Sequence, residues 1–234
     1  MIPEVLATGL GAAAAGVLAL GVYDPNSRVF GSVVGRGPRG ARTLYLTFDD
    51  GPNRTATPRI LQTLEAEGVP AAFFMVGAHV RQHPALAREV AARGHEVGNH
   101  TQHHVKLHVR GPRRIRRELE EAHATLTETV GRAPRVFRAP HGYRNPLVTA
   151  AARGLGYRVI GWTFGVWDSA RPGAEEIRRR VGRKLRPGAI ILLHDGDGYD
   201  AAGDRQQTAA ALPGIIRDAR AAGYAFRPLG EVLA

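Results

Sequence analysis

Residues Thr47–Pro52 read Thr-Phe-Asp-Asp-Gly-Pro and follow the apolar run Leu44–Leu46. This run predicts a buried strand, and the Gly-Pro pair marks the turn that ends it. Side chains within a strand alternate, but a strand that is just ending can direct two adjacent carboxylates, Asp49 and Asp50, into one cleft. A turn that only caps the strand explains the same residues, because Asp, Gly and Pro all favour turns. The rest of the chain distinguishes the two interpretations.

From Thr43 onward, patterns typical of strands and of helices alternate along the chain. Repeating βα units predict an α/β fold with a mainly parallel sheet, and seven of them can close or nearly close a barrel. The predicted strands are Thr43–Phe48, Ala71–Val76, Glu96–Asn99, Val136–Ala139, Tyr157–Trp162, Ala189–His194 and Tyr224–Phe226. The predicted helices are Thr57–Glu67, Pro84–Arg93, Pro112–Val130, Pro146–Arg153, Ala174–Leu185 and Thr208–Ala222.

The N-terminal segment Val5–Tyr23 carries no charged residue over 19 positions, which is enough for one membrane-spanning helix. We expect residues 1–23 to form a hydrophobic membrane anchor, with a cleaved signal as second choice and a soluble buried helix as third. Residues 24–41, interrupted by Gly and Pro, predict a linker or a strap on the outside of the barrel. Residues 42–234 then form the main domain.

The formal net charge is +11, almost all of it from arginine, and the chain has no cysteine. Disulfides and thiolate metal sites are therefore excluded. The sequence contains no nucleic-acid-binding module and no interleaving of aromatic and basic residues, so we expect no nucleic-acid partner. The better interpretation is a solvated arginine-rich surface that faces an anionic envelope. We expect a monomer.

Polar residues recur at the C-terminal ends of the predicted strands, where the βα loops of a barrel converge. His100 and His104 follow the third strand with a spacing that places both imidazoles on one face of a helical turn. With one carboxylate they would make a metal-binding set that leaves positions open for water and substrate. His103 makes the pair His100/His103 a competing geometry, and a solvated His-rich loop is the structural alternative.

Four motifs then occur in order: Thr47–Pro52, His100-Thr101-x-x-His104, Arg138-x-Pro140 and Leu192-Leu193-His194-Asp195. Together they resemble the polysaccharide deacetylase family, which is carbohydrate esterase family 4 and is built on the NodB-homology domain. The resemblance extends from about Arg42 to the C-terminus. It implies a distorted (β/α)7 barrel that binds one divalent metal, usually zinc, with Co²⁺, Ni²⁺ or Mn²⁺ as alternatives. It also implies removal of acetyl groups from N-acetylated polymers such as chitin and peptidoglycan, or from O-acetylated xylan.

The resemblance assigns Asp50, His100 and His104 to the metal and makes Asp49 the general base. A bound zinc ion lowers the pKa of water to near ~7, and a neighbouring carboxylate can accept the proton. Arg138 resembles the arginine that pairs with this base. A guanidinium in that place would hold the carboxylate in position and keep it ionised.

His194 resembles the general acid, which as an imidazolium protonates the departing amine. The resemblance makes Asp168 the carboxylate that orients this histidine and raises its pKa. Leu192, two residues earlier on the same strand face, resembles the apolar residue that lines the pocket for the acetyl methyl group.

Three further residues are candidates for substrate binding. His141 stands where the family often has an aromatic residue, and Tyr143 is a candidate to substitute for that aromatic ring. Trp167 precedes Asp168, whereas the family usually places Trp directly after that Asp. Stacking on a sugar and packing within the protein are therefore equal alternatives for Trp167. Trp162, on an apolar strand, is expected in the core.

We therefore expect a metal-dependent hydrolase that removes N-acetyl groups from N-acetylglucosamine-type units of a cell-wall or chitin-like polymer. One alternative is a deacetylase or deformylase of a membrane lipid-linked sugar, another is an esterase of the O-acetyl xylan type, and a third is a non-catalytic carbohydrate-binding barrel. We expect a membrane-anchored protein with its catalytic domain outside the cytoplasm, and secretion as the second choice. The arginines that follow the N-terminal segment instead favour the cytoplasmic side.

Overall fold

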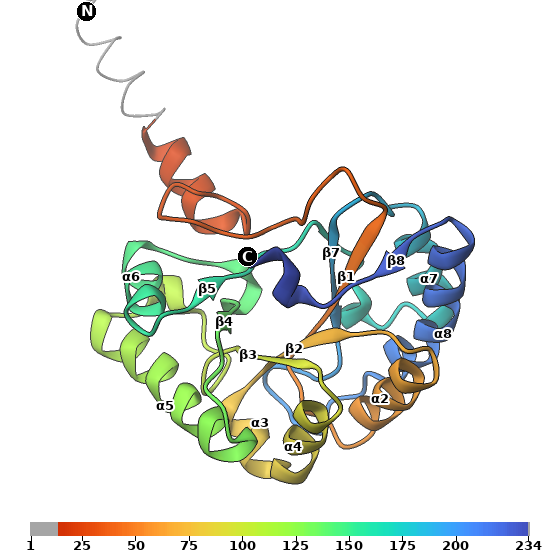
Figure 1. Cartoon of the computed structure of the whole chain (residues 1–234). Coiled ribbons are helices and arrows are strands. Elements are labelled where there is room, and N and C mark those ends of the chain that lie inside the picture. The colour runs from red at the N-terminus through yellow and green to blue at the C-terminus, as the bar shows by residue number, and fades with distance from the viewer. Residues whose placement is uncertain (1–13, 234) are drawn as a thin grey trace, which may run out of the picture.

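The computed structural model describes residues 14–233, and its centre is a parallel sheet in the strand order β5-β4-β3-β2-β1-β7-β6, with β8 paired to β1. Helices surround the sheet on its outer side (Figure 1). This arrangement confirms the α/β class and is that of a distorted (β/α)7 barrel. The strands are β1 Thr43–Asp49, β2 Ala71–Met75, β3 Glu96–Asn99, β4 Val136–Phe137, β5 Arg158–Val159, β6 Phe164–Gly165, β7 Ala189–His194 and β8 Ala225–Phe226.

Six of the helices lie where the sequence predicts them, to within two or three residues at each end. Pro occupies the first turn of α4, α5 and α6, where its missing N–H costs no hydrogen bond. A helix that the sequence patterns did not reveal, α3, follows β2 directly. The helices are α2 Ala56–Ala66, α3 Gly77–Gln82, α4 Pro84–Ala92, α5 Pro112–Val130, α6 Pro146–Gly154, α7 Ala174–Gly182 and α8 Gln206–Ala221.

The prediction of one strand over Tyr157–Trp162 is wrong in its extent. The ladder with β4 covers only β5, and a separate strand, β6, pairs with β7. The backbone at Gly161 leaves the ladder to bond instead with Val34, whose carbonyl accepts the Gly161 N–H at 3.0 Å. The predicted strand Tyr157–Trp162 therefore contains a bend at Gly161 that the local sequence pattern does not reveal.

Strand β1 is the centre of the domain, paired with β2 on one side and with β7 on the other. Its alternate residues Leu44, Leu46 and Phe48 pack in the cluster that the helices cover, whereas Tyr45 packs among the residues that line the inside of the sheet. The register places Asp49 directly opposite His194 of β7. The sheet thus brings a carboxylate and an imidazole to one end of the barrel.

Residues 24–41 lie against the domain as a strap. Val34 forms a parallel bridge with Ile160, just after β5, and Arg36 an antiparallel bridge with Ala189. The strap therefore lies between β5 and β7, near the two ends of the strand order. Before it, residues 14–23 are helical, and the earlier part of the expected anchor, residues 1–13, lies outside the described residues. Among residues 14–233, each helix is too short or too polar to cross a membrane.

Candidate active site

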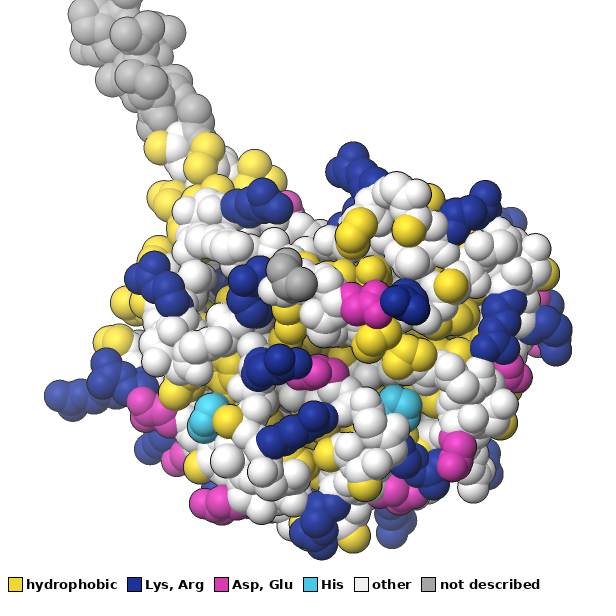
Figure 2. All heavy atoms as spheres, viewed as in Figure 1, with side chains coloured by type: hydrophobic (Ala, Val, Ile, Leu, Met, Phe, Trp, Pro, Cys, Tyr) yellow, Lys and Arg dark blue, Asp and Glu magenta, His cyan; other side chains and the backbone are white. Residues whose placement is uncertain are grey.

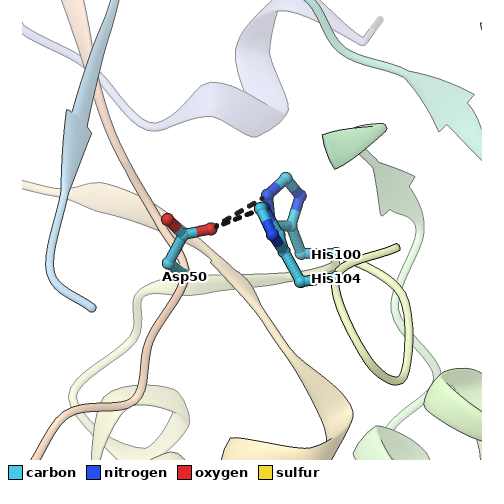
Figure 3. Close-up of side chains that lie close together, drawn as sticks. All are labelled: Asp50, His100 and His104. Atoms are coloured by element: carbon cyan, nitrogen blue, oxygen red, sulfur yellow. Dashed lines mark ion pairs between the residues drawn. The ribbon is translucent and has the colours of Figure 1, made fainter. Parts of the chain in front are cut away.

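Asp50, His100 and His104 meet at the C-terminal end of the sheet, and all three side chains are buried (Figure 3). Oδ1 of Asp50 lies 3.3 Å from Nε2 of His100 and 3.1 Å from Nε2 of His104. The three candidate ligands that the sequence predicts are therefore within reach of one ion.

Backbone conformation sets this arrangement. Asp50 and His104 both have positive φ, 75° and 53°, which few non-glycine residues adopt. The His104 N–H donates to Oγ1 of Thr101 at 3.0 Å, and the Asp50 carbonyl pairs with Nδ1 of His79 at 2.8 Å. Such sparsely populated conformations persist only where surrounding contacts hold them, and they cluster at functional sites.

The cluster has the chemistry of a divalent-metal site. Nδ1 of His100 lies 2.8 Å from the Arg138 carbonyl, so it carries the proton and leaves the Nε2 lone pair facing Asp50. Oδ1 of Asp50 is buried and has no hydrogen-bond donor among the described residues. Because acceptors converge there, a cation fits the position. The donor set of two imidazoles and one carboxylate suits zinc and several other divalent metals.

His103 does not belong to this cluster. Its backbone N–H and its Nδ1 both contact the buried carboxylate of Glu118, at 2.8 and 3.0 Å, and its side chain is half exposed. The competing pair His100/His103 is therefore wrong, because Glu118 on α5 holds the His103 ring away from Asp50.

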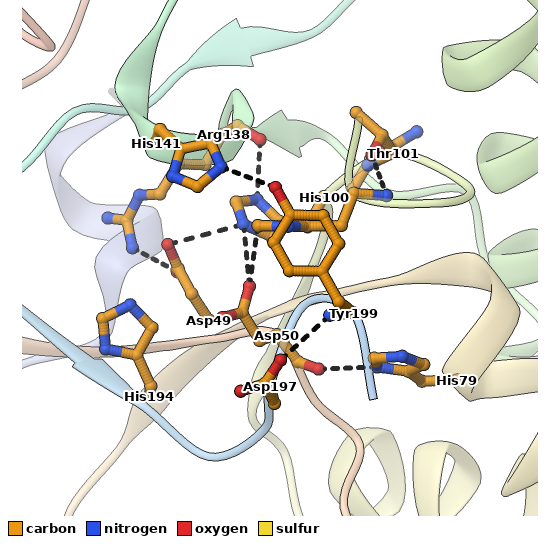
Figure 4. A network of polar contacts seen from close by, with 12 residues as sticks. Asp49, Asp50, His79, His100, Thr101, Arg138, His141, His194, Asp197 and Tyr199 are labelled. Carbon is orange, nitrogen blue, oxygen red and sulfur yellow. Dashed lines mark hydrogen bonds and ion pairs between the residues drawn. The ribbon is translucent and has the colours of Figure 1, made fainter. Parts of the chain in front are cut away.

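Asp49 lies beside the cluster and is held by Arg138 (Figure 4). Nη1 of Arg138 donates to Oδ1 of Asp49 at 2.6 Å and to Oγ1 of Thr47 at 2.9 Å. The guanidinium is fully buried, and its carbon lies 4.1 Å from the centroid of the Phe74 ring. A buried charge-assisted pair of this kind fixes the carboxylate in orientation. The other carboxylate oxygen of Asp49 lies 3.8 Å from Nε2 of His100, at the edge of the candidate metal position.

His194 stands at the end of β7 and is held by Asp168. Its Nδ1 lies 2.9 Å from Oδ1 of Asp168, and its backbone N–H donates to Oδ2 at 2.8 Å. Burial opposes the charged imidazole, but the Asp168 charge and hydrogen bond, helped by Asp50 and Asp49, raise the pKa of His194 to about 9. For Asp168, burial opposes ionisation, but the His194 contacts and a hydrogen bond from Thr208 keep its pKa below the ordinary value. The structure therefore pairs His194 with Asp168, although the residues around Asp168 depart from the family pattern.

One cavity of about 390 Å³ connects these groups. Leu192 lines it from β7, and Trp167, with 76% of its surface exposed, lines it from the loop after β6. Tyr143 and His141 line it from the loop after β4. Trp162, expected in the core, is partly buried but also reaches this cavity.

A family model described as polysaccharide deacetylase matches residues 36–160 of the chain. Over 204 residues the chain is 39% identical to a chitooligosaccharide deacetylase of Sinorhizobium fredii, an alignment that covers 85% of this chain and 95% of that protein. The chain belongs to the polysaccharide deacetylase family. A peptidoglycan-N-acetylglucosamine deacetylase of Bacillus cereus is 35% identical over 198 residues, which cover 84% of this chain and 90% of that one.

A solved structure of similar shape shows that the fold alone does not establish activity in polysaccharide deacetylases. It is a carbohydrate esterase family 4 pseudoenzyme from Bacillus anthracis. The TM-score is 0.79 with 27% identity, and the match covers 87% of this chain and 69% of that one. Catalysis by a polysaccharide deacetylase therefore depends on its site residues and not on the fold alone.

The sequence patterns missed one wall of the cavity of this polysaccharide deacetylase, the loop over residues 197–205. Tyr199 lies there with 66% of its surface exposed, and its hydroxyl is 3.0 Å from Nε2 of His141 (Figure 4). Gly198 packs so closely on His104 that a Cβ would lie 2.2 Å from its Nδ1. Arg205, buried and paired with Asp197 at 2.8 Å, holds the loop. The only sequence signal was a Gly- and Asp-rich turn after the last motif.

Proposed function

We propose that the chain is a zinc-dependent deacetylase that hydrolyses N-acetyl groups on N-acetylglucosamine-type units of a peptidoglycan or chitin-like glycan. The observation that carries this proposal is the meeting of three groups around one cavity: the Asp50–His100–His104 cluster, the Asp49–Arg138 pair and the His194–Asp168 pair. Binding of a sugar alone needs neither a buried carboxylate held by an arginine nor an imidazolium. The relatives named for chitooligosaccharide and peptidoglycan deacetylation support the N-acetyl substrate.

Asp50, His100 and His104 would hold the zinc ion, which supplies Lewis-acid chemistry by polarising the amide carbonyl and making water more acidic. Asp49 takes the proton from the attacking water, because its carboxylate lies beside the cluster and Arg138 holds it in place. Arg138 contacts Asp49 with Nη1 and the Gly161 carbonyl with Nη2, so the guanidinium cannot swing away.

His194 supplies the second proton transfer. An amine leaves poorly as an anion, so the nitrogen must be protonated as the C–N bond breaks. Nδ1 of the imidazolium donates its hydrogen bond to Asp168, so the Nε2 proton is presented to the cavity. Leu192 lies two residues before His194 on the same face of β7, where it receives the acetyl methyl group. Trp167 presents an exposed indole face against which a sugar ring can stack.

The function is tested by incubating the purified, zinc-loaded chain with chitooligosaccharides, peptidoglycan and O-acetylated xylan and measuring released acetate. We expect acetate from the N-acetylated glycans, its loss on chelation and its return when zinc is restored. His103→Ala serves as the control, because His103 points away from the cluster. Release from xylan alone would assign the chain to O-acetyl esterases, and no release from any substrate by metal-loaded protein would make it a non-catalytic barrel.

The same proposal includes attachment to a membrane, with the catalytic domain outside the cytoplasm and acting as a monomer. The uncharged stretch Val5–Tyr23 supports attachment, and the cell-wall substrates of relatives support the location. Protease added to intact cells should degrade the catalytic domain, whereas a protected domain would place it on the cytoplasmic side. Light scattering of detergent-extracted protein measures the oligomeric state.

A further inference from the structure

Large apolar side chains are exposed at two places in the described part of the chain. Trp167 and Tyr199 line the catalytic cavity. The others lie on the N-terminal helix of residues 14–23 or on domain segments that adjoin its base, and Figure 2 shows hydrophobic side chains at the base of this projecting segment. They are Val17, Leu18, Leu20 and Tyr23 on the helix, and Val29, Val109 and Leu147 on the domain.

The three domain residues, Val29, Val109 and Leu147, are exposed on segments that contact the base of that helix directly or through His108, and we call this set the apolar collar. Val29 packs against Gly21 of the helix, where an added Cβ would lie 3.1 Å from a Val29 methyl group. Val109 follows His108, whose ring packs against Tyr23 with 5.7 Å between centroids. Leu147 lies in the first turn of α6, which begins beside Asn145, and Asn145 donates to the His108 carbonyl at 3.0 Å. Segments far apart in sequence thus present one apolar surface.

Exposed cations adjoin this collar. Arg28 precedes Val29, Arg110 follows Val109, and Lys106 lies three residues before Val109. Aliphatic side chains with basic neighbours are the combination that binds the surface of a bilayer containing anionic lipid. Residues 14–20 are all apolar or glycine and all exposed, so this helix presents no polar face to water.

The base of the helix is joined to the wall of the catalytic cavity by hydrogen bonds and ring packing. Arg144 is buried; its backbone N–H donates to the Val22 carbonyl at 3.1 Å, and its guanidinium donates to the carbonyls of Asp24, Pro25 and Ser27. The preceding residue, Tyr143, lines the cavity and also packs on Tyr23 with 5.2 Å between ring centroids. Tyr143 therefore lies between the cavity and the base of the helix and contacts both.

We propose that the apolar collar and its cations dock on an anionic bilayer surface and hold the mouth of the catalytic cavity at that surface. This docking rests on the proposed membrane attachment, and it adds that the domain lies against the lipid in one orientation. The charge of the collar and its continuity with an uncharged helix favour lipid over a second copy of this chain, whose equally basic collar would repel it.

Single-cysteine labelling tests the docking, because the chain of 234 residues contains no cysteine of its own. Val109→Cys and Leu147→Cys, each carrying an environment-sensitive fluorophore, are mixed with vesicles of phosphatidylcholine and phosphatidylglycerol that contain a spin-labelled quencher lipid. Ala66→Cys is the matched control, because Ala66 is exposed at the end of α2, far from the N-terminal helix (Figure 1). Both collar probes should shift to the blue and be quenched, whereas the control probe should remain unquenched.

A second experiment tests the cations by comparing Arg110→Gln, next to the collar, with the control variant Arg88→Gln on α4. The first should weaken vesicle binding about fivefold, the effect of one cation near an anionic surface, and the second should leave it unchanged. Collar probes quenched no more than the Ala66 probe would overturn the proposal. Spectral shifts that appear without vesicles and grow with protein concentration would assign the collar to a second copy and also overturn it. Acetate release from soluble chitooligosaccharides by the same labelled proteins tests the catalytic proposal separately.

Discussion

Replacing Asp168 with Asn removes one charge from the His194 pair and changes little else. The side chain is buried, and it accepts hydrogen bonds from the His194 backbone N–H and from Thr208. An Asn can keep these bonds through its carbonyl oxygen while its amide donates to Nδ1 of a neutral imidazole. The substitution therefore favours the uncharged form of His194 without leaving a buried donor unpaired.

The expected magnitude follows from the environment of His194. Burial lowers the pKa of His194, yet Asp168, together with Asp50 and Asp49, raises it from 6.5 to about 9. That difference corresponds to ~3 kcal/mol in favour of the imidazolium. Asp168 supplies the largest raising contribution, and losing an adjacent opposite charge typically lowers a pKa by about 1–3 units. A cation bound by Asp50 offsets part of the remaining negative charge, so in loaded enzyme the pKa lies below 9.

The assay is the pH dependence of kcat for acetate release by metal-loaded protein. His194 acts as an acid, so activity is present below its pKa and is lost as pH rises through it. In Asp168→Asn this basic limb should therefore move about 1–3 units toward lower pH. Thr208→Val is the control, because it removes a hydrogen bond to Asp168 but no charge, and its basic limb should stay near that of wild type. A basic limb in Asp168→Asn that coincides with wild type would falsify the role of Asp168.

The remaining predictions concern the metal and the base. His104→Ala should lose most bound zinc, measured by metal analysis after gel filtration, whereas His103→Ala should retain it; the reverse pattern would show that the ligands are wrongly assigned. Asp49→Asn should keep its metal but lose ~10²–10⁴-fold in kcat, and acetate release near the wild-type rate would remove Asp49 from the mechanism. Arg138→Ala should lower the free energy of unfolding in urea by ~3–5 kcal/mol, because it leaves a buried carboxylate unpaired; a cost below ~1 kcal/mol would mean that solvent reaches Asp49.

The sequence predicted the barrel well because its central strands β1, β2 and β7 are short, largely apolar runs that end in turns. It failed between Tyr157 and Gly165, where the predicted strand ends at Trp162 but the structure has the short strand β5, a bend and the separate strand β6. What separates these strands is a tertiary contact: Oγ1 of Thr163 donates to the Gly35 carbonyl of the strap at 2.8 Å. A partner that lies 128 residues away leaves no local pattern to read.

The candidate site was predictable where its residues lie in motifs and not where loops complete it. Asp168 could be proposed only by analogy, since its neighbours depart from the family pattern, and the 2.9 Å contact with His194 comes from the structure. Tyr199 gave no signal, because an exposed tyrosine in a Gly- and Asp-rich loop has no periodicity. Its position depends on the Asp197–Arg205 pair and on the packing of Gly198 against His104, both of which are tertiary.

The end of β1 explains how two adjacent carboxylates can enter one cleft and still differ in chemistry. Successive side chains of a strand point to opposite faces, so a regular strand would send only one of Asp49 and Asp50 inward. The positive φ of Asp50 breaks the alternation and turns its carboxylate toward the imidazoles, while Asp49 keeps its strand register and meets Arg138. An arginine stays charged at any physiological pH, so Asp49 keeps a cationic partner that fixes its carboxylate in place. Neutral imidazoles offer lone pairs, so a carboxylate beside them completes a cation site. The different roles of Asp49 and Asp50 thus follow from the positive φ of Asp50 at the point where the strand ends.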